Sequence, residues 1–232
     1  MRELTTLEKI LIGVLVVLLG LGAFLLFRPK TDYNKMLQEG IQSNKLSKVE
    51  TALNNGADAN MTINGTSALV QAIKQITSSH SDPSIANALI SAGADIMDSE
   101  VIITAMKKGS SGVHIADYSV DFLPNLISLG VDVNTKIDGV NDVYCYAVKM
   151  NMNPRVVSAS VAGGANVNGH IDGEPYNALE HVIRTGMHNM VSTLARLGAE
   201  PPESIDGVPL RQYVFSKYGQ AVIDAFYSNL FK

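Results

Sequence analysis

The sequence is poor in the residues that make disulfides and metal sites. Its single cysteine, Cys145, cannot form an internal disulfide, which excludes a disulfide-stabilised framework but leaves the cellular compartment open. There is no Cys-x-x-Cys pair, and even the closest two of the five histidines, His181 and His188, stand seven residues apart. Zinc sites need closer ligand pairs than this. We therefore predict neither a metal nor any other cofactor.

An excess of basic residues is also missing. The chain has 18 Lys and Arg against 22 Asp and Glu, and residues 1–30 hold four of the former and two of the latter. From Thr31 onward the counts are 14 and 20, which gives a net charge of −6. Nucleic-acid binding needs a clustered basic face, so this balance argues against it and permits a partner protein with a basic surface.

Catalytic motifs are absent as well. The segment Gly109 to Gly112 follows two lysines, but it lacks the preceding strand and the Gly-Lys-Ser ending of a phosphate-binding loop. His80, His114 and His170 fall in expected loops, where a solvated or capping role is typical. No Ser-His-Asp or paired-carboxylate arrangement can be built from residues that would face each other. We expect a protein that is not an enzyme.

One long hydrophobic run stands near the N-terminus. Ile10 to Phe27 is an 18-residue stretch without charge, and as a helix it would be about 27 Å long, enough to cross a bilayer core. A buried core helix would show a polar face, and a cleaved signal peptide would end in small residues, but this run ends in Phe27 and Arg28. We predict a tail at 1–9, a transmembrane anchor at 10–27, a linker at 28–33 and a domain at 34–232.

The side of the membrane is less clear. Two basic residues precede the run and four follow it closely, which favours a cytoplasmic domain. Long domains, however, cross with little regard to charge, and a short N-terminal tail usually stays inside. The charges leave both placements open, and we place the domain outside the cytoplasm. Initiation at Met36 would give a minor soluble form without the anchor.

Beyond this run, one phrase recurs five times. Leu53-Asn54-Asn55-Gly56-Ala57-Asp58 has counterparts around Gly93, Gly130, Gly164 and Gly198, at intervals of 37, 37, 34 and 34 residues. Each copy reads as a helix C-terminus, because glycine adopts the positive φ that closes a last turn. Upstream of each glycine, apolar residues three and four apart predict a helix. A shorter helix, opened in most copies by Asn-Gly or Asp-Gly, precedes that one.

This pattern resembles the ankyrin-repeat family from about Asn34 to Tyr227. Gly186, Val191, Leu194, Gly198 and Ala199 fit the second half of the family motif, whereas Thr-Pro-Leu-His is nowhere intact and the third unit lacks a glycine turn. The resemblance implies an all-α solenoid of about six helix-pair units with atypical capping units at both ends. Cys145 falls where the repeat has a buried leucine, which predicts a core thiol.

The repeat assignment also predicts the places of two insertions and three prolines. The longer intervals place insertions at Ile76 to Asp82 and Gly109 to Ser119, between the two helices of units two and three. Pro83 and Pro154 then fall near first helical positions. Pro124 fits only if its helix begins near Val120 to Phe122.

The family binds partner proteins on a concave face made of hairpin tips and first helices. The resemblance carries this role, unit by unit, to fifteen positions, and Tyr176 is the expected anchor because exposed aromatics supply contact area at low entropic cost. They are Asn64, Thr66, Lys74 and Gln75 in unit two; Lys107 and Lys108 in unit three; Asp138, Val140, Met150 and Asn151 in unit four; and Asp172, Glu174, Tyr176, Arg184 and Thr185 in unit five.

The layout is similar to that of the membrane-anchored ankyrin immunity proteins that accompany type VI secretion lipase effectors. This resemblance implies a periplasmic domain that binds a secreted toxin and blocks it. An alternative is a membrane-tethered scaffold or assembly factor for an endogenous complex. A third is an effector aimed at host proteins, although an uncleaved N-terminal span counts against secretion.

The anchor hypothesis makes a direct prediction. Full-length protein should stay in the membrane pellet after an alkaline carbonate wash, because a spanning helix is held by its apolar length and not by charge. A mature N-terminus beyond Ala23, found by mass spectrometry, would show instead that the run is a cleaved signal.

Overall fold

The computed structural model describes residue 14 and residues 31–76, 82–110 and 121–231. The predicted tail and anchor lie outside the described residues except for Val14, as do residues 28–30 of the predicted linker. None of the helices in the described part of the chain is both long and apolar enough to cross a membrane. The residues from Asn34 onward form one compact unit.

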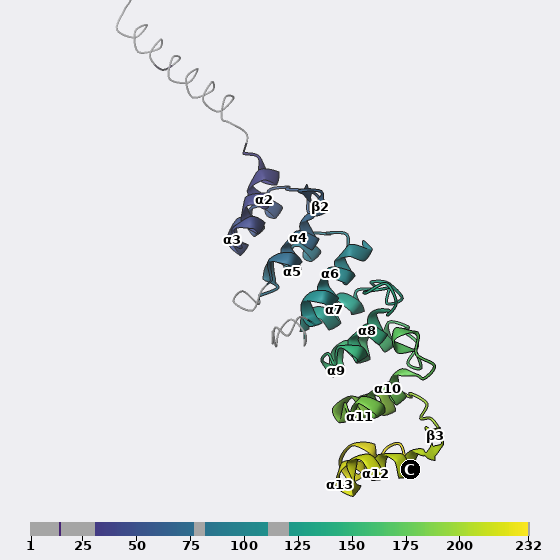
Figure 1. The fold of residues 1–232 in the computed structure, drawn as a ribbon. Coiled ribbons are helices and arrows are strands. Elements are labelled where there is room, and N and C mark those ends of the chain that lie inside the picture. The colour runs from purple at the N-terminus through teal and green to yellow at the C-terminus, as the bar shows by residue number, and fades with distance from the viewer. Residues whose placement is uncertain (1–13, 15–30, 77–81, 111–120, 232) are drawn as a thin grey trace, which may run out of the picture. The chain divides into compact units, whose positions relative to one another are not determined.

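In the described residues this unit consists of six helix pairs (Figure 1). A first and a second helix, joined by a short connection or an insertion, make up each pair. The pairs are α2 (Tyr33–Gln42) and α3 (Leu46–Asn54); α4 (Ala68–Gln75) and α5 (Ser84–Ser91); α6 (Ser99–Ser110) and α7 (Leu123–Ser128); α8 (Val143–Lys149) and α9 (Pro154–Ala162); α10 (Ala178–Thr185) and α11 (His188–Arg196); and α12 (Leu210–Tyr218) with the short α13 (Gln220–Val222) and the π-helix η3 (Ile223–Tyr227).

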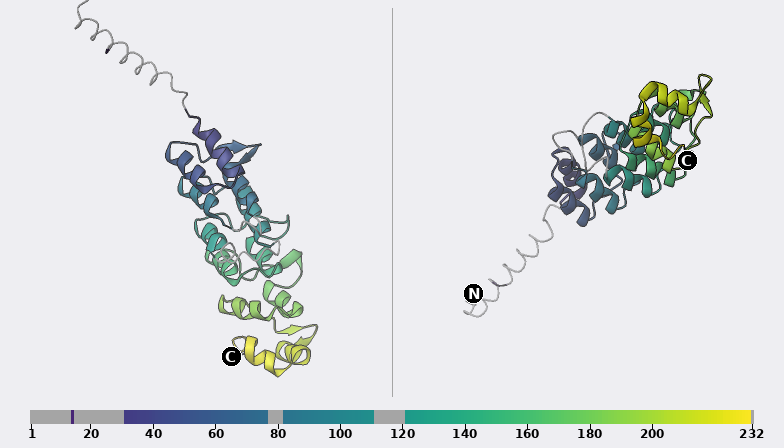
Figure 2. Two further views of the ribbon diagram at one scale, coloured as in Figure 1. Left: turned by 90° about the vertical axis from the view of Figure 1, so that its left-hand side faces the viewer. Right: turned by 90° about the horizontal axis from the view of Figure 1, so that it is seen from below.

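The pairs stack in chain order, so that each contacts its neighbours (Figure 2). The first helices α4, α6, α8 and α10 form one row, and contacts between second helices, such as α7 with α9 and α9 with α11, form the other. The turns that lead from one pair to the next lie on the side of the stack away from the second helices (Figure 1). The predicted solenoid of about six helix pairs is confirmed.

Short β-hairpins occupy some of the turns of this all-α domain. β1 (Thr62–Ile63) pairs with β2 (Thr66–Ser67), and β3 (Ser204–Ile205) pairs with β4 (Val208–Pro209). The residues between them, Asn64-Gly65 and Asp206-Gly207, all have positive φ. That is the type I′ geometry for which Asn-Gly and Asp-Gly are preferred. Asp172-Gly173 also has positive φ, within the short 3-10 helix η2 (Ile171–Gly173).

Apolar burial runs the whole length of the stack. Leu179 and Ile183 of α10 are fully buried, as are Leu69 and Ile73 at the equivalent positions of α4. In unit six the same positions hold Arg211 and Phe215, which are both exposed. Within the described residues no further helix pair packs on this face of α12, so these two positions face solvent. This matches the prediction that the last unit is an atypical cap.

The recurring glycines end the second helices as predicted. Gly56, Gly93, Gly130, Gly164 and Gly198 all have positive φ, between 88° and 101°. At Gly164 the glycine N–H donates to the carbonyl of Val161, and the next N–H, of Ala165, donates to that of Ser160. This is the Schellman pattern, which satisfies carbonyls that the helix end would leave unpaired.

The prolines and the first insertion also lie where the register requires. Pro83 directly precedes α5, Pro154 begins α9, and Pro124 is the second residue of α7, inside its first turn. The first predicted insertion, Ile76 to Asp82, falls between α4 and α5, and its residues 77–81 lie outside the described residues. Of the second, Gly109 to Ser119, the first two residues belong to the end of α6 and the others lie outside the described residues.

Gly164→Val should destabilise the domain strongly. The φ of Gly164 is +99° and nothing lies within 4 Å of an added Cβ, so the cost comes from backbone conformation and not from a clash. A β-branched residue held at positive φ loses about 1–3 kcal/mol. Urea unfolding followed by circular dichroism measures the loss.

The matched control is Ala162→Val, which puts the same side chain at the exposed last residue of α9. There the ordinary helix propensity difference is about 0.5 kcal/mol. Equal losses in the two variants would contradict the role given to the glycine.

Candidate partner-binding surface

The fifteen predicted contact residues lie at the turns and at the last turns of the first helices, and none of them is buried. Six are half-buried and nine are exposed. The half-buried ones are Thr66, Gln75, Lys108, Glu174, Tyr176 and Arg184; the exposed ones are Asn64, Lys74, Lys107, Asp138, Val140, Met150, Asn151, Asp172 and Thr185. Their accessibility is what a contact surface requires, and their part in binding stays a prediction.

Two of the predicted cations, and one further lysine, connect neighbouring units. Lys74 of α4 pairs with Glu100 of α6 at 2.9 Å, and Arg184 of α10 binds both carboxylate oxygens of Asp206, at 3.0 and 3.1 Å. Lys149, which the sequence did not single out, pairs with Asp172 at 2.6 Å. Each cation lies near the C-terminal end of its helix, where the helix dipole favours positive charge. These side chains therefore position one unit against the next.

A buried asparagine, Asn141, joins the turns that contain Asp138 in unit four and Asp172 in unit five. Asn141 is 1% exposed, and its side-chain nitrogen donates to Asp138 at 2.9 Å and to Asp172 at 2.7 Å. Its side-chain oxygen accepts from the backbone N–H of Asp172 at 2.8 Å. Lys149 lies within 3.5 Å of Asp138 and 2.6 Å of Asp172. Four polar side chains thus make one network between two units.

The network stabilises its carboxylates in the charged form. Burial by itself would raise the pKa of Asp138, but the hydrogen bonds from Asn141 and Val140 and the charge of Lys149 outweigh it and hold the pKa at about 2. The hydrogen bonds from Lys149 and Asn141 lower the pKa of Asp172 as well. Both groups are therefore carboxylates at neutral pH.

Unit five presents an aromatic ring fixed by an arginine. The guanidinium of Arg184 lies 4.9 Å from the ring centroid of Tyr176, a cation–π arrangement. Arg184 is itself held by Glu180, one turn earlier on α10, and by Asp206 of unit six. The hydrogen bonds that Arg184 donates to Asp206 and Glu180 raise its pKa, and burial raises the pKa of Tyr176. The predicted anchor is thus half-buried and oriented before any partner arrives.

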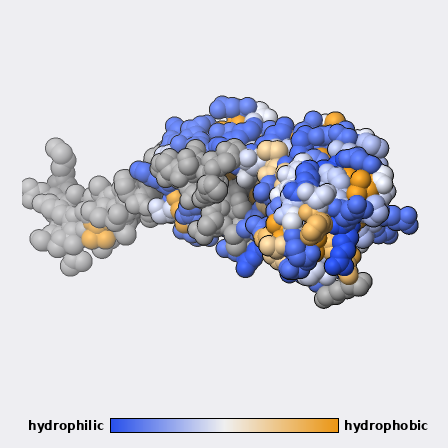
Figure 3. Space-filling model, turned by 60° about the horizontal axis from the view of Figure 1, so that its bottom comes forward, coloured by the Kyte–Doolittle hydropathy of each residue, from blue (hydrophilic) through white to orange (hydrophobic). Residues whose placement is uncertain are grey.

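Exposed apolar side chains are scattered over the described surface. Met97 is 67% exposed, Val140 53% and Leu129 46%, and all three lie in the turns between units. Phe215 on unit six is 55% exposed. The view onto the C-terminal end shows such residues as separate spots in a largely hydrophilic surface (Figure 3).

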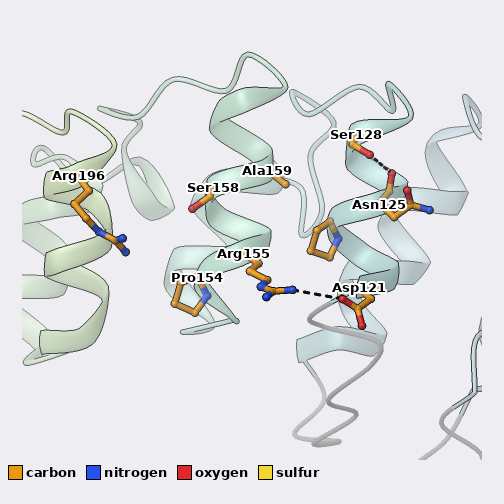
Figure 4. Close-up of a pocket in the computed structure, with 9 residues that line it drawn as sticks. Asp121, Asn125, Ser128, Pro154, Arg155, Ser158, Ala159 and Arg196 are labelled. Atoms are coloured by element: carbon orange, nitrogen blue, oxygen red, sulfur yellow. Dashed lines mark hydrogen bonds and ion pairs between the residues drawn. The ribbon is translucent and has the colours of Figure 1, made fainter.

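A shallow groove of about 660 Å³ runs across the second helices α7 and α9 (Figure 4). Small residues such as Ser158 and Ala159 line it, and Arg155 reaches across to Asp121 at 3.5 Å. Both partners of this pair are highly exposed, so the contact contributes little. Arg196 approaches from α11. The groove lies on the opposite row of helices from the predicted surface.

Two reactive groups lie inside the stack. Cys145 is buried, and burial raises the pKa of its thiol to about 12, so the predicted core thiol is confirmed. His188, at the start of α11, is within hydrogen-bonding distance of the Tyr227 hydroxyl at 3.0 Å and packs against Tyr218 and Phe226. Burial lowers the pKa of His188. It joins unit six to unit five.

The sequence predicted the residues exposed at the turns and helix ends, but not the residues that hold them in place. Asn141, Lys149 and Glu180 were not among the predicted positions, although they hold Asp138, Asp172 and Arg184 in place. Lys149 and Arg184 share a signal, since both lie at the end of a first helix with an acidic tip following 22 or 23 residues later. Asn141 gives no such signal.

Asn141→Ala should destabilise the domain by about 1–3 kcal/mol, because it leaves a backbone N–H and two carboxylates without their shared partner. Asn134→Ala is the control, since that exposed side chain bonds only within its own turn. Urea unfolding measures both. An equally small effect at the two positions would mean that the network carries no stability.

Acid titration provides a second readout. The pKa of Asp138 falls from 3.8 to about 2 on folding, so the stabilisation is full above 3.8 and is lost as pH falls towards about 2. Asn141→Ala should flatten this part of the stability curve. A curve parallel to that of the wild type would exclude Asn141 as the cause.

Comparison with known proteins adds a likeness in fold. No family model and no curated protein matches the chain. Among solved structures, the chain is similar to the crystal structure of the human ASB11 ankyrin repeat domain, at 20% sequence identity and a TM-score of 0.48. The match covers 71% of this chain and 69% of that one. The solenoid assignment rests on the geometry of the helix pairs themselves.

Proposed function

We propose that residues 34–232 bind another protein through the turns and first helices of units four and five. The observation that carries this proposal is the orientation of Tyr176 by Arg184, which Glu180 and Asp206 hold in turn. Tyrosine and arginine are the residues that most often dominate binding energy at protein interfaces. A side chain ordered in advance also loses less conformational entropy on binding.

The neighbouring side chains suit the surroundings of such an anchor. Val140 is exposed at the tip of unit four, and Asn141 joins that tip to Asp172 of unit five. Met150 is exposed at the end of α8. Apolar side chains beside an aromatic, bordered by charged groups, make up the centre and rim of a typical interface.

The finer proposal is an immunity protein. In it, residues 10–27 anchor the chain in the bacterial inner membrane, and the domain in the periplasm binds and blocks a lipase-type toxin delivered by a type VI secretion system. The uncharged run at 10–27 and the layout of the chain support this reading. A tether at the membrane that the toxin attacks would raise the local concentration of the inhibitor.

The test is a double variant, Tyr176→Ala with Glu174→Lys. Asp172 is left unchanged because it pairs with Lys149 and Asn141, so that replacing it would disturb the stack. Loss of a buried aromatic anchor costs about 2 kcal/mol or more of binding free energy. Phe215→Ala is the control, because it removes another exposed aromatic, on the terminal unit.

The readout is survival against a sister strain that delivers the toxin, run beside a growth curve. We expect the double variant to be sensitive and to grow normally alone, while Phe215→Ala behaves as wild type. A growth or assembly defect without sensitivity would indicate the scaffold instead. Survival of a complete deletion at the wild-type level would refute the immunity proposal.

A further inference from the structure

The connecting turns hold more than half of the acidic residues of the domain, whereas the positive charge lies mainly on the first helices. The five connecting turns, residues 55–67, 92–98, 129–142, 163–177 and 197–209, are here called the turn edge. They contain eleven acidic residues and one basic residue, Lys136, a net charge of −10. Because the sequence from Thr31 onward carries −6, the remainder of the domain carries +4. The overall charge thus conceals a strongly acidic edge on a weakly basic body.

Part of this acidity has an internal role. Asp58, Asp95 and Asp132 accept hydrogen bonds from the backbone two residues ahead, and Asp142 caps α8. Such bonds satisfy lone pairs but leave the negative charge in place. Asp138 and Asp172 share Lys149, and Asp206 pairs with Arg184.

Two acids on the turn edge have no such role. Glu200 and Glu203 are exposed, and no hydrogen bond or ion pair of the described residues uses their carboxylates. They lie in the turn between units five and six, next to the tip that bears Asp206. Charges without internal partners are free to meet charges from outside.

The turn edge also carries several exposed apolar side chains. Met97, Leu129 and Val140 all belong to it, at 67%, 46% and 53% exposure, and the half-buried Tyr176 lies in its fourth turn. A row of acids alone would suit a cation. Within the described residues, however, no three acidic, histidine or cysteine side chains are grouped so as to hold a metal ion. Acids spread over five turns and interspersed with apolar side chains match an extended macromolecular surface instead.

We infer that the partner protein docks along the turn edge with a basic face that also carries apolar side chains. This inference rests on the proposed protein-binding function and adds the chemistry of the partner. Opposite potentials raise the association rate, and the apolar side chains then contribute the desolvated contacts. The second helices carry a net charge of only +1, so their side of the stack offers such a face no comparable attraction.

The test compares two double charge reversals with the same net charge, made in the full-length chain in neutral detergent. Glu200→Lys with Glu203→Lys alters the turn edge, whereas Glu50→Lys with Asp121→Lys alters the second-helix side. Helices about 10 Å across separate the two sides. The screening length is about 10 Å at 0.1 M salt, so each pair acts mainly on its own side.

The probe is a poly-L-lysine peptide, with poly-L-glutamate as the negative control, and binding is followed by fluorescence anisotropy. We expect the turn-edge variant to bind poly-L-lysine about tenfold more weakly and the control variant less than about twofold more weakly. Circular dichroism confirms that both variants are folded. Equal weakening by the two pairs would show an effect of net charge alone and would overturn the inference.

A second copy of this chain is the other conceivable occupant, because the body of one molecule is basic and the edge of another acidic. Sedimentation of the unmodified protein at low and high salt decides this. A salt-sensitive dimer that Glu200→Lys with Glu203→Lys abolishes would overturn the inference of a separate partner. Poly-L-lysine binding does not depend on any toxin, so failure of the immunity proposal in the competition assay leaves this result unaffected.

Discussion

A helix pair of this size cannot bury its apolar residues by itself, and the rest of the structure follows from that constraint. Leu69 and Ile73, or Leu179 and Ile183, are removed from water only because another pair lies against them. Burying such a side chain stabilises the fold by about 1.5–3 kcal/mol, so each unit depends on its neighbours. The chain must therefore turn back at the same place in every unit. The glycines at the second-helix ends and the tight turns that follow provide this reversal.

The fold was predictable because its signals are local. A glycine that ends a helix, an Asn-Gly or Asp-Gly pair that forms a hairpin, and apolar residues three and four apart each act within a few positions, and each recurs. Repetition turned weak signals into a register, which also located Pro124 and the first insertion. The strands of the hairpins β1–β2 and β3–β4 are only two residues long. The sequence therefore predicted the turns between them but not their pairing as strands.

The surface was less predictable because its organisation is not local. Family resemblance places Asp138, Asp172 and Arg184 at tips and helix ends, yet their partners are decided by contacts between units. Asn141 meets Asp172 across 31 residues of sequence, and Arg184 meets Asp206 across 22. Such pairings form only when neighbouring units lie against each other in the folded protein. The same contacts divide the predicted charges into those that hold the stack together and those that are free to meet a partner.

The aromatic packing at the end of the stack has a practical consequence for fusion proteins. Phe231 stacks on Tyr227 at 6.4 Å, Arg211 lies over the Phe231 ring, and Tyr227 in turn contacts His188 of unit five. The last described residue of the chain is thus part of the cap and not a free tail. A reporter or affinity tag joined directly after Lys232 would compete with this packing. A flexible glycine-serine spacer would let the appended domain stand clear of the aromatic cluster and leave the terminal unit intact.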